Sequence, residues 1–195
     1  MLYRIVKTAA AVFLSMFFRV KIVGEENIPT ENGCIVCANH SSNWDPVFLV
    51  AFLKRRIYFM AKDELFHIFG LGALLKAIGI IPVKRNSSDI SAVRTSIRVL
   101  NEGKALGIFP SGTRVKKGEN AEVKSGVAFI AVKAAVPVIP VYIEASYRIF
   151  SKVVIHVGKG EDFAVYGKAK LSSEELGRIS NGLFKHIYAL AEEAK

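Results

Sequence analysis

The stretch GCIVCANHSSNWDPVFLVAFL at residues 33–53 carries the strongest fold signal in the chain. Its first part, residues 33–38, is a short apolar run that stops at the polar pair Asn39–His40, which is typical of a strand buried on both faces. A loop of mostly polar residues follows, and residues 48–53 are apolar enough to form a short helix. A buried strand that leads through a loop into a helix is the repeating unit of α/β domains.

The rest of the chain repeats this alternation of strand and helix. Strands are predicted for residues 20–23, 57–61, 80–83, 105–109, 138–143 and 153–157. Helices are predicted for residues 64–77, 89–101, 124–134 and for a last segment that opens on a capping-box pattern at 172–175 and runs towards 194. We therefore expect an α/β fold with a mixed, mostly parallel central sheet covered by helices. The expected organisation is an amphipathic, membrane-associating helical segment over residues 1–20, followed by one α/β domain over residues 21–195.

Composition limits the class of partner. The chain has 195 residues, 51% of them hydrophobic, a net charge of +10 and a mean hydropathy of +0.32. Such an apolar chain is not disordered, and two cysteines are too few for a disulfide-stapled secreted scaffold. High apolar content with excess positive charge favours a partner that is both apolar and anionic, such as a membrane or a lipid phosphate, or an acidic partner protein. Nucleic acid would account for the charge but not for the apolar content, so no nucleic-acid partner is expected.

Residues 1–20 combine basic and apolar residues in a helical pattern. The apolar run at residues 9–18, interrupted only by Ser15, is well short of the roughly 20 residues that a membrane-spanning helix needs. On a helical wheel one stripe is polar or small (Arg4, Lys7, Thr8, Ala11, Ser15 and Arg19) and the opposite face is apolar (Leu2, Ile5, Val6, Ala9, Phe13, Met16 and Phe17). We expect this helix to lie in the headgroup region of a membrane. The alternatives are a signal peptide, although residues 18–21 offer no small-residue cleavage site, and a helix packed on its own domain.

Polar residues gather where the predicted strands end, which is where α/β domains place their functional loops. After the strand at 33–38 come His40 and, five residues later, Asp45. A turn between them would let the carboxylate accept a hydrogen bond from one ring nitrogen of the imidazole and leave the other nitrogen free as a base. The alternative is an ordinary loop histidine, with Asp45 as a helix N-cap ahead of Pro46.

Two more strand ends carry positive charge. The strand at 80–83 leads into Lys84 and Arg85, and the strand at 105–109 leads into the turn PSGTR at 110–114. Small residues allow a backbone to approach an anion, hydroxyls donate to it, and a guanidinium binds a phosphate with two bonds. We therefore expect an anion site where these strand ends share one edge of the sheet. Solvated basic turns are the alternative.

These segments resemble, in order, the sequence blocks of the glycerolipid acyltransferases, and most of all those of the bacterial 1-acylglycerol-3-phosphate acyltransferases. The blocks are NHSSNWD at 39–45, AKDEL at 61–65, GIIPVKR at 79–85, FPSGTR at 109–114 and VPVIPV at 136–141. The resemblance covers residues 37–142, and the ordered set is far more specific than a single NHxxxxD match.

The resemblance implies direct transfer of an acyl group from a thioester to the sn-2 hydroxyl of 1-acylglycerol-3-phosphate, which gives phosphatidic acid. His40 would act as general base, oriented by Asp45, while Asn39 or backbone N–H groups of the first loop would face the oxyanion. The acceptor phosphate would be held by Lys62, Arg85 and Arg114, supported by Lys84, Ser111, Gly112 and Thr113. Acyl-coenzyme A or acyl carrier protein would supply the acyl group as co-substrate, with no metal and no other cofactor.

The resemblance also implies where the protein works. Its substrate is a membrane lipid, so we expect a peripheral or monotopic protein on the cytoplasmic face of the cell membrane, with the membrane surface and acyl carrier protein as expected partners. The apolar residues between the phosphate blocks are candidates for an acyl channel or for ordinary core: Leu65, Phe66, Phe69, Leu71, Leu74 and Leu75.

One position departs from the family pattern. Ser111 stands where the third block of the family has a glutamate that is implicated in acceptor binding. A serine hydroxyl still forms hydrogen bonds but carries no charge, so the acceptor headgroup stays open at this point. The alternatives are an acyltransferase for another lysolipid or for glycerol phosphate, and a non-catalytic peripheral lipid-binding protein.

Overall fold

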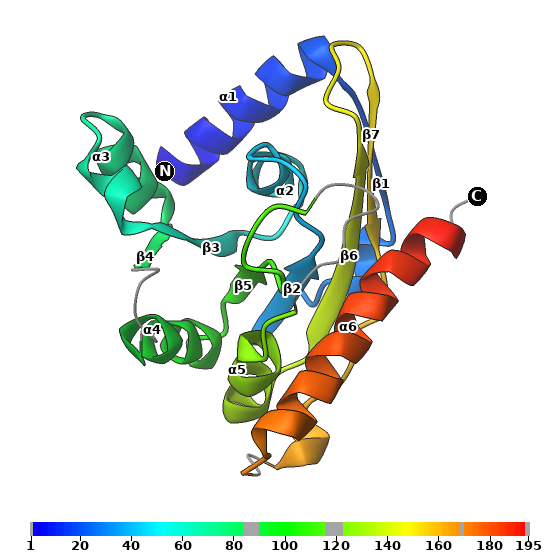
Figure 1. The fold of residues 1–195 in the computed structure, drawn as a ribbon. Helices are drawn as coiled ribbons and strands as arrows, with labels where there is room; N and C mark the ends of the chain where they lie inside the picture. Colours follow the sequence, from blue (N-terminus) through cyan, green and yellow to red (C-terminus); the bar gives the residue numbers. More distant parts are fainter. Residues whose placement is uncertain (1, 84–89, 116–122, 168–169, 194–195) are drawn as a thin grey trace.

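One seven-stranded sheet forms the centre of the molecule in the computed structural model, which describes residues 2–83, 90–115, 123–167 and 170–193 (Figure 1). The strands are β1 (Arg19–Val23), β2 (Cys34–Ala38), β3 (Ile57–Lys62), β4 (Ile81–Val83), β5 (Ala105–Ile108), β6 (Val138–Ala145) and β7 (Lys152–Val157). Their order across the sheet is β1-β7-β6-β2-β5-β3-β4.

The strand directions confirm the predicted mixed, mostly parallel sheet. Neighbouring strands from β6 through β2, β5 and β3 to β4 are parallel, whereas β7 is antiparallel to β6 and β1 is parallel to β7. Because parallel strands end at the same side, β6, β2, β5, β3 and β4 all end at one edge of the sheet, which we call the carboxyl edge.

Helices cover both faces of the sheet (Figure 1). On one face lie α1 (Leu2–Phe17) and α2 (Asp45–Phe52), and on the other lie α4 (Ile90–Asn101), α5 (Gly126–Ala134) and α6 (Ser173–Glu193). Every residue of β2 is buried because this strand is central and covered on both sides. Its two cysteines show the alternation, since Cys34 belongs to the core cluster under α1 and α2 and Cys37 to the cluster under α4, α5 and α6.

The N-terminal helix both packs on the domain and presents an apolar face. Leu14 is fully buried in the core, and Ala10 and Ala11 pack beside it. On the face formed by these residues, the helix is therefore docked on its own domain, as the alternative interpretation expected. The side chains that stay exposed form a separate apolar stripe: Leu2, Ile5, Val12, Phe13 and Met16. Among the described residues, no helix is both long and apolar enough to cross a membrane.

Several expected boundaries of helices move in the structure. α1 ends at Phe17 rather than at residue 20, because Arg19–Val23 pairs with β7 as β1. The helix expected at 64–77 is broken into a 3-10 helix, Asp63–His67, and α3 (Leu71–Ile78). The break lies at Gly70, whose φ of +76° is the left-handed conformation that favours glycine.

Candidate active site

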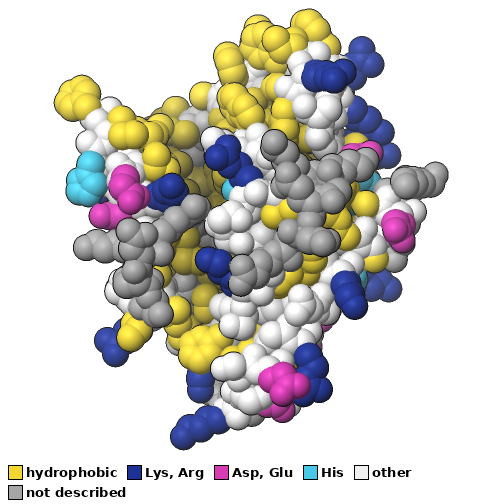
Figure 2. All heavy atoms as spheres, viewed as in Figure 1, with side chains coloured by type: hydrophobic (Ala, Val, Ile, Leu, Met, Phe, Trp, Pro, Cys, Tyr) yellow, Lys and Arg dark blue, Asp and Glu magenta, His cyan; other side chains and the backbone are white. Residues whose placement is uncertain are grey.

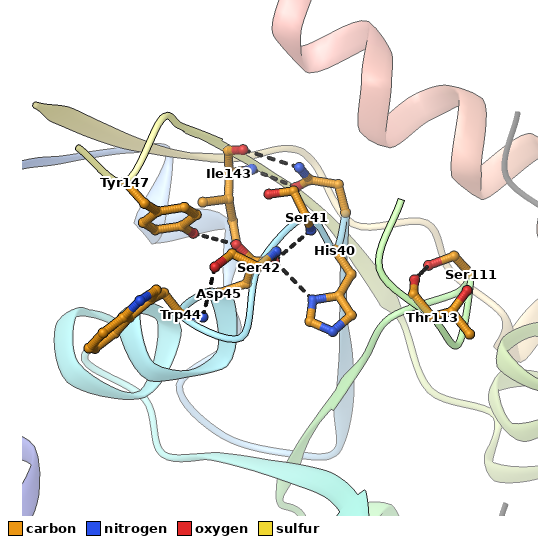
Figure 3. Close-up of polar contacts among 10 residues, drawn as sticks. His40, Ser41, Ser42, Trp44, Asp45, Ser111, Thr113, Ile143 and Tyr147 are labelled. Carbon is orange, nitrogen blue, oxygen red and sulfur yellow. Dashed lines mark hydrogen bonds and ion pairs between the residues drawn. The ribbon is translucent and has the colours of Figure 1, made fainter. Parts of the chain in front are cut away.

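A histidine and an aspartate meet at the carboxyl edge, where β2 ends and α2 begins (Figure 3). The His40 Nδ1 atom lies 2.9 Å from the Asp45 Oδ2 atom. With the carboxylate accepting from Nδ1, the proton of the neutral imidazole stays on that nitrogen and Nε2 keeps a free lone pair. The His40 side chain is 14% exposed, so the imidazole is mostly buried but still meets solvent. The pair therefore has the geometry of a general base with its orienting carboxylate.

The Asp45 carboxylate is fully buried and is surrounded by donors. Its Oδ2 atom also accepts the backbone N–H groups of Ser41 and Ser42, each at 2.7 Å, and its Oδ1 atom accepts the hydroxyl of Tyr147. Burial, followed by the charge of Asp45, raises the pKa of Tyr147, so this hydroxyl stays protonated and donates. The carboxylate does not cap α2, because its hydrogen bonds turn back into the loop. The helix-cap alternative for Asp45 is therefore wrong.

Aromatic rings hold the other side of the imidazole. The ring of His40 stacks on Phe109 with 4.1 Å between centroids and 18° between planes, and Phe109 stacks in turn on Phe59 at 5.6 Å. Gly107 makes room for this stack, because a Cβ atom there would lie 2.1 Å from the Phe59 ring. The loop after β5 is also bound to the histidine backbone, since the N–H of Val115 donates to the His40 carbonyl at 2.8 Å.

The side chain of Asn39 bonds to a neighbouring strand. Its side chain is buried, its amide nitrogen donates to the Ile143 carbonyl at 3.1 Å, and its amide oxygen accepts the Ile143 N–H at 2.7 Å. These two bonds tie the end of β2 to β6. The amide nitrogen carries a second N–H group, so the expectation that Asn39 contacts the oxyanion stays a prediction. The N–H groups of Ser41 and Ser42 are used by Asp45.

The turn after β5 is held by its own residues. The N–H of Gly112 donates to the Phe109 carbonyl at 2.9 Å, and the φ of Gly112 is +64°, which favours glycine at this position. The Ser111 hydroxyl is buried and donates to the Thr113 carbonyl at 2.6 Å. Ser111, which stands where the family pattern has a glutamate, thus stabilises the turn from inside. Thr113 and Arg114 lie on the exposed side of the turn.

The expected cations follow neighbouring strands. Lys62 is the last residue of β3 and Arg114 follows β5, the strand beside it, and both are exposed. Lys84 and Arg85 lie outside the described residues. The strand before them, β4, pairs in register with β3 so that Val83 lies opposite Lys62. The structure therefore brings Lys62 and Arg114 to the same edge as His40 through the parallel strand order.

The sequence of the chain is similar to those of several known proteins. The acyltransferase family model matches residues 19–144. A 1-acyl-sn-glycerol-3-phosphate acyltransferase of Bacillus subtilis is 34% identical over 194 residues, 97% of this chain and 96% of that protein. The chain belongs to the acyltransferase family. A mouse 1-acyl-sn-glycerol-3-phosphate acyltransferase alpha is 31% identical over 69% of this chain and 48% of that one.

A solved acyltransferase also shares the fold. The crystal structure of the 1-acyl-sn-glycerophosphate acyltransferase PlsC from Thermotoga maritima matches with a TM-score of 0.75 and 30% identity, over 99% of this chain and 79% of that one. The family resemblance predicted from the sequence blocks is confirmed.

Sequence reasoning missed two residues near this candidate site. Tyr147 lies 102 positions from Asp45 and belongs to none of the sequence blocks, so no local signal marked it. Lys124 is the second: its N–H donates to the Pro110 carbonyl at 3.0 Å, and its side chain lies over Gly112. Both come to the carboxyl edge only through the folding of distant segments. Among the described residues, no group of three or more His, Cys, Asp or Glu side chains is placed to hold a metal ion.

The apolar residues considered for an acyl channel are mostly at the surface. Phe66 is buried, whereas Leu65 and Leu74 are more than a third exposed and Phe69 is fully exposed. They lie on the 3-10 helix after β3, on α3 and between the two. This region thus offers an exposed apolar surface at the end of the sheet where Lys62 lies.

Proposed function

We propose that this acyltransferase moves a fatty acyl group from an acyl thioester to the sn-2 hydroxyl of 1-acylglycerol-3-phosphate, which gives phosphatidic acid. The observation that carries the proposal is the His40–Asp45 pair at 2.9 Å, whose Nε2 atom has no hydrogen-bond partner among the described residues, on the same edge as Lys62 and Arg114. The printed names of relatives in bacteria and in mouse support the acceptor. Acyl-coenzyme A and acyl carrier protein are the two candidate donors.

The proposed reaction needs one base and no covalent enzyme intermediate. The Nε2 atom of His40 takes the proton of the acceptor hydroxyl while the hydroxyl oxygen attacks the thioester carbonyl. A C–O bond forms, the C–S bond of the tetrahedral intermediate breaks, and the proton passes from His40 to the leaving thiolate. Asp45 keeps the Nδ1 proton in place throughout. General-base help of this kind contributes about 10²–10⁴-fold, so positioning must supply the rest.

Positioning of the acceptor is the proposed task of the cations. Lys62 and Arg114 are exposed at the ends of adjacent strands, as a site for an incoming phosphate requires. Arg85 and Lys84 complete the proposed set from outside the described residues. Thr113 and the backbone of Gly112 support it from the exposed side of the turn. Ser111 acts in this proposal only by holding that turn, since its hydroxyl is used by the Thr113 carbonyl.

We further propose that the protein binds the cytoplasmic face of the cell membrane peripherally. Apolar side chains gather over α1 and α3 on the face shown in Figure 2. Side chains that are more than half exposed include Phe13 and Met16 on α1, Ile68 and Phe69 before α3, and Phe150 before β7. The N–H of Phe150 donates to the Phe17 carbonyl, which joins the last of these segments to the end of α1. Exposed apolar area of this extent suits a lipid surface.

Positive charge flanks this apolar face. An open hollow of about 560 Å³ lies between α1 and the start of β3. It is lined by Tyr3, Arg4, Lys7, Thr8, Lys54 and Arg56. A basic flank beside an apolar stripe favours anionic lipid. Lys7 also has a role within the fold, since its ammonium donates to the carbonyls of Leu53 and Lys54 at the end of α2.

A second candidate acceptor is another lysolipid or glycerol phosphate. The observation that favours it is the uncharged Ser111, which faces inward where the family pattern has a glutamate. A site without that carboxylate has one fewer group to select among acceptor headgroups.

The test uses the full purified chain with lipid vesicles. 1-Acylglycerol-3-phosphate is supplied with acyl-coenzyme A or with acylated carrier protein, and phosphatidic acid is measured for the wild type and for His40→Ala. We expect the variant to lose about 10³-fold in kcat. The matched control is His186→Ala, because that histidine lies on α6 and pairs with Glu161 rather than with Asp45. Product formation by His40→Ala at the wild-type rate would refute the mechanism, and a folded wild type that makes product only from another acceptor would favour the second candidate.

A further inference from the structure

The hydroxyl of Tyr147 touches the catalytic pair from a segment outside all the sequence blocks. Tyr147 follows β6, and its hydroxyl donates to the Oδ1 atom of Asp45 (Figure 3). Its ring packs against Phe48 of α2, with 5.5 Å between ring centroids. The tyrosine therefore joins the end of β6 to the first turn of α2, on which Asp45 lies.

The two carboxylate oxygens of Asp45 accept hydrogen bonds from different partners. Oδ2 accepts from His40 and from the backbone of Ser41 and Ser42, whereas within the described part of the chain Oδ1 accepts only from Tyr147. A fully buried oxygen without a donor is costly, and a carboxylate held at one oxygen resists rotation about its Cβ–Cγ bond less than one held at both. Such a turn would carry Oδ2 away from the Nδ1 proton. The tyrosine hydroxyl thus fixes the plane of the carboxylate.

The backbone at Tyr147 is unusual for a large side chain. Its φ is +54°, a left-handed conformation that bulky residues rarely adopt. The turn that follows is held by hydrogen bonds from the N–H of Ser151 to the Arg148 carbonyl and from the N–H of Phe150 to the Phe17 carbonyl. A strained conformation that the surrounding structure maintains, and that delivers a hydroxyl to a buried carboxylate, indicates a role for that hydroxyl.

We propose that Tyr147 is a positioning residue for the acyl transfer, which fixes the Asp45 carboxylate so that the Nε2 atom of His40 faces the acceptor hydroxyl. It acts through Asp45 and touches neither substrate. The inference rests on the proposed function, since it presumes that His40 is the base. The hydroxyl donates over the whole working range because burial and the Asp45 charge raise the pKa of Tyr147.

The proposal predicts a specific kinetic signature for Tyr147→Phe. The value of kcat falls about tenfold, the loss expected for one hydrogen bond to a charged group, while the KM values of both substrates stay unchanged. The acid limb of the pH profile of kcat/KM moves to higher pH, because a carboxylate with one donor fewer favours the protonated form of the imidazole. Among the described residues, the titratable side chains that interact with Asp45 are His40 from its own loop, Tyr147 after β6 and Tyr188 from α6.

A matched control separates this role from packing. Tyr142→Phe likewise removes one tyrosine hydroxyl, but Tyr142 lies on β6 and packs with the core cluster on the opposite face of the sheet from Tyr147. Tyr142→Phe should keep the wild-type kcat and pH profile. The midpoint of thermal unfolding is measured for each variant, so that activity is compared only between folded proteins.

The decisive measurement combines Tyr147→Phe with Asp45→Asn. If Tyr147 acts only through the carboxylate, Tyr147→Phe should not lower kcat any further in a protein that already carries Asp45→Asn. If the tyrosine were merely structural, Tyr147→Phe would lower kcat by the same factor in the wild type and in Asp45→Asn, and that result would overturn the proposal. Wild-type rate and pH profile in Tyr147→Phe would also overturn it. A folded wild-type chain that makes no acylated product would instead refute the proposed function, independently of either variant.

Discussion

The two ends of the carboxyl edge are built in opposite ways. At the histidine end, formed by His40, Asp45 and Tyr147, the polar groups bond to one another and the carboxylate is fully buried. At the cation end, formed by Lys62 and Arg114, both side chains are exposed and neither has a polar partner among the described residues.

This difference matches the two tasks of an acyltransferase. A base must already be oriented before the reaction begins, so its partners belong to the protein. A phosphate site must stay vacant until the ligand supplies the countercharge, so its cations face solvent. Substitutions at the histidine end should therefore change kcat, and substitutions at the cation end should change KM for the acceptor.

The largest expected effect comes from breaking the histidine end at its carboxylate. Asp45→Asn should lower kcat by about 10²-fold or more, because an amide no longer fixes the Nδ1 proton of His40 by charge. Steady-state kinetics on vesicles measures this, with KM for the acceptor unchanged. The control is Asp162→Asn, an exposed aspartate that accepts the Ala164 N–H at 2.9 Å. A raised KM with an unchanged kcat would contradict the division between the two ends.

The next effect tests the aromatic support of the same end. Gly107→Ala places a methyl group 2.1 Å from the Phe59 ring, so the stack of Phe59 and Phe109 on His40 must shift. We expect the free energy of unfolding to fall by about 1–3 kcal/mol. We also expect kcat to fall about tenfold, as when a catalytic group loses its alignment.

The controls for this change follow from the same contact. Phe59→Leu added to Gly107→Ala should recover part of the lost stability, since the smaller side chain makes room for the methyl group. Gly177→Ala on α6 meets no atom within 4 Å, so it should leave activity as in the wild type and raise the free energy of unfolding by about 0.5–1 kcal/mol, because alanine favours a helix interior. Equal stability of Gly107→Ala and wild type would show that the ring stack is not packed as described.

Substitutions at the cation end should weaken binding of the acceptor and leave the chemical step unchanged. Lys62→Gln and Arg114→Gln should each raise KM for 1-acylglycerol-3-phosphate about fivefold to tenfold, because each removes one charged partner of the phosphate. The value of kcat should stay within about twofold of wild type. Lys185→Gln, an exposed lysine on α6, is the control and should change neither constant. A loss of kcat without a change in KM would place these cations in the chemical step.

The smallest effect concerns the apolar stripe of α1. Phe13→Ser together with Met16→Ser should weaken cosedimentation with anionic vesicles roughly fivefold, since both side chains are more than half exposed and would enter the lipid only in part. Thermal unfolding should be unchanged for the same reason. Val165→Ser removes an equally exposed apolar residue away from this face and should bind vesicles like the wild type. Unchanged binding by the α1 variant would refute the proposed membrane contact.

Short-range patterns predicted a large part of this molecule. The apolar run of β2 predicted a central strand, and the spacing of His40 and Asp45 predicted their pairing, because both depend on residues that are close in the chain. The capping box predicted at the last helix is present as well, with Ser172 and Glu175 exchanging backbone hydrogen bonds. Helix 64–77 was predicted as continuous, but the left-handed backbone at Gly70 divides it.

Predictions that needed a partner from elsewhere in the chain were less successful. Asn39 belongs to the most specific sequence block, yet no local pattern predicted that its amide bonds to Ile143 of β6, 104 positions away. The helical wheel of α1 placed Val6 and Phe17 on the face for lipid, whereas both are partly buried in the structure. An amphipathic pattern shows that a helix has an apolar side but not what covers it.

By itself the sequence determined most strands and helices, the pairing of His40 with Asp45, and the family, because these follow from local spacing and from ordered blocks. Only the tertiary structure decided which distant residues contact that pair. Tyr147 reaches Asp45 across 102 positions, and Phe109 reaches His40 from another strand. The parallel order of β6, β2 and β5 sets these meetings, and strand order is a property of long-range packing that no local pattern encodes.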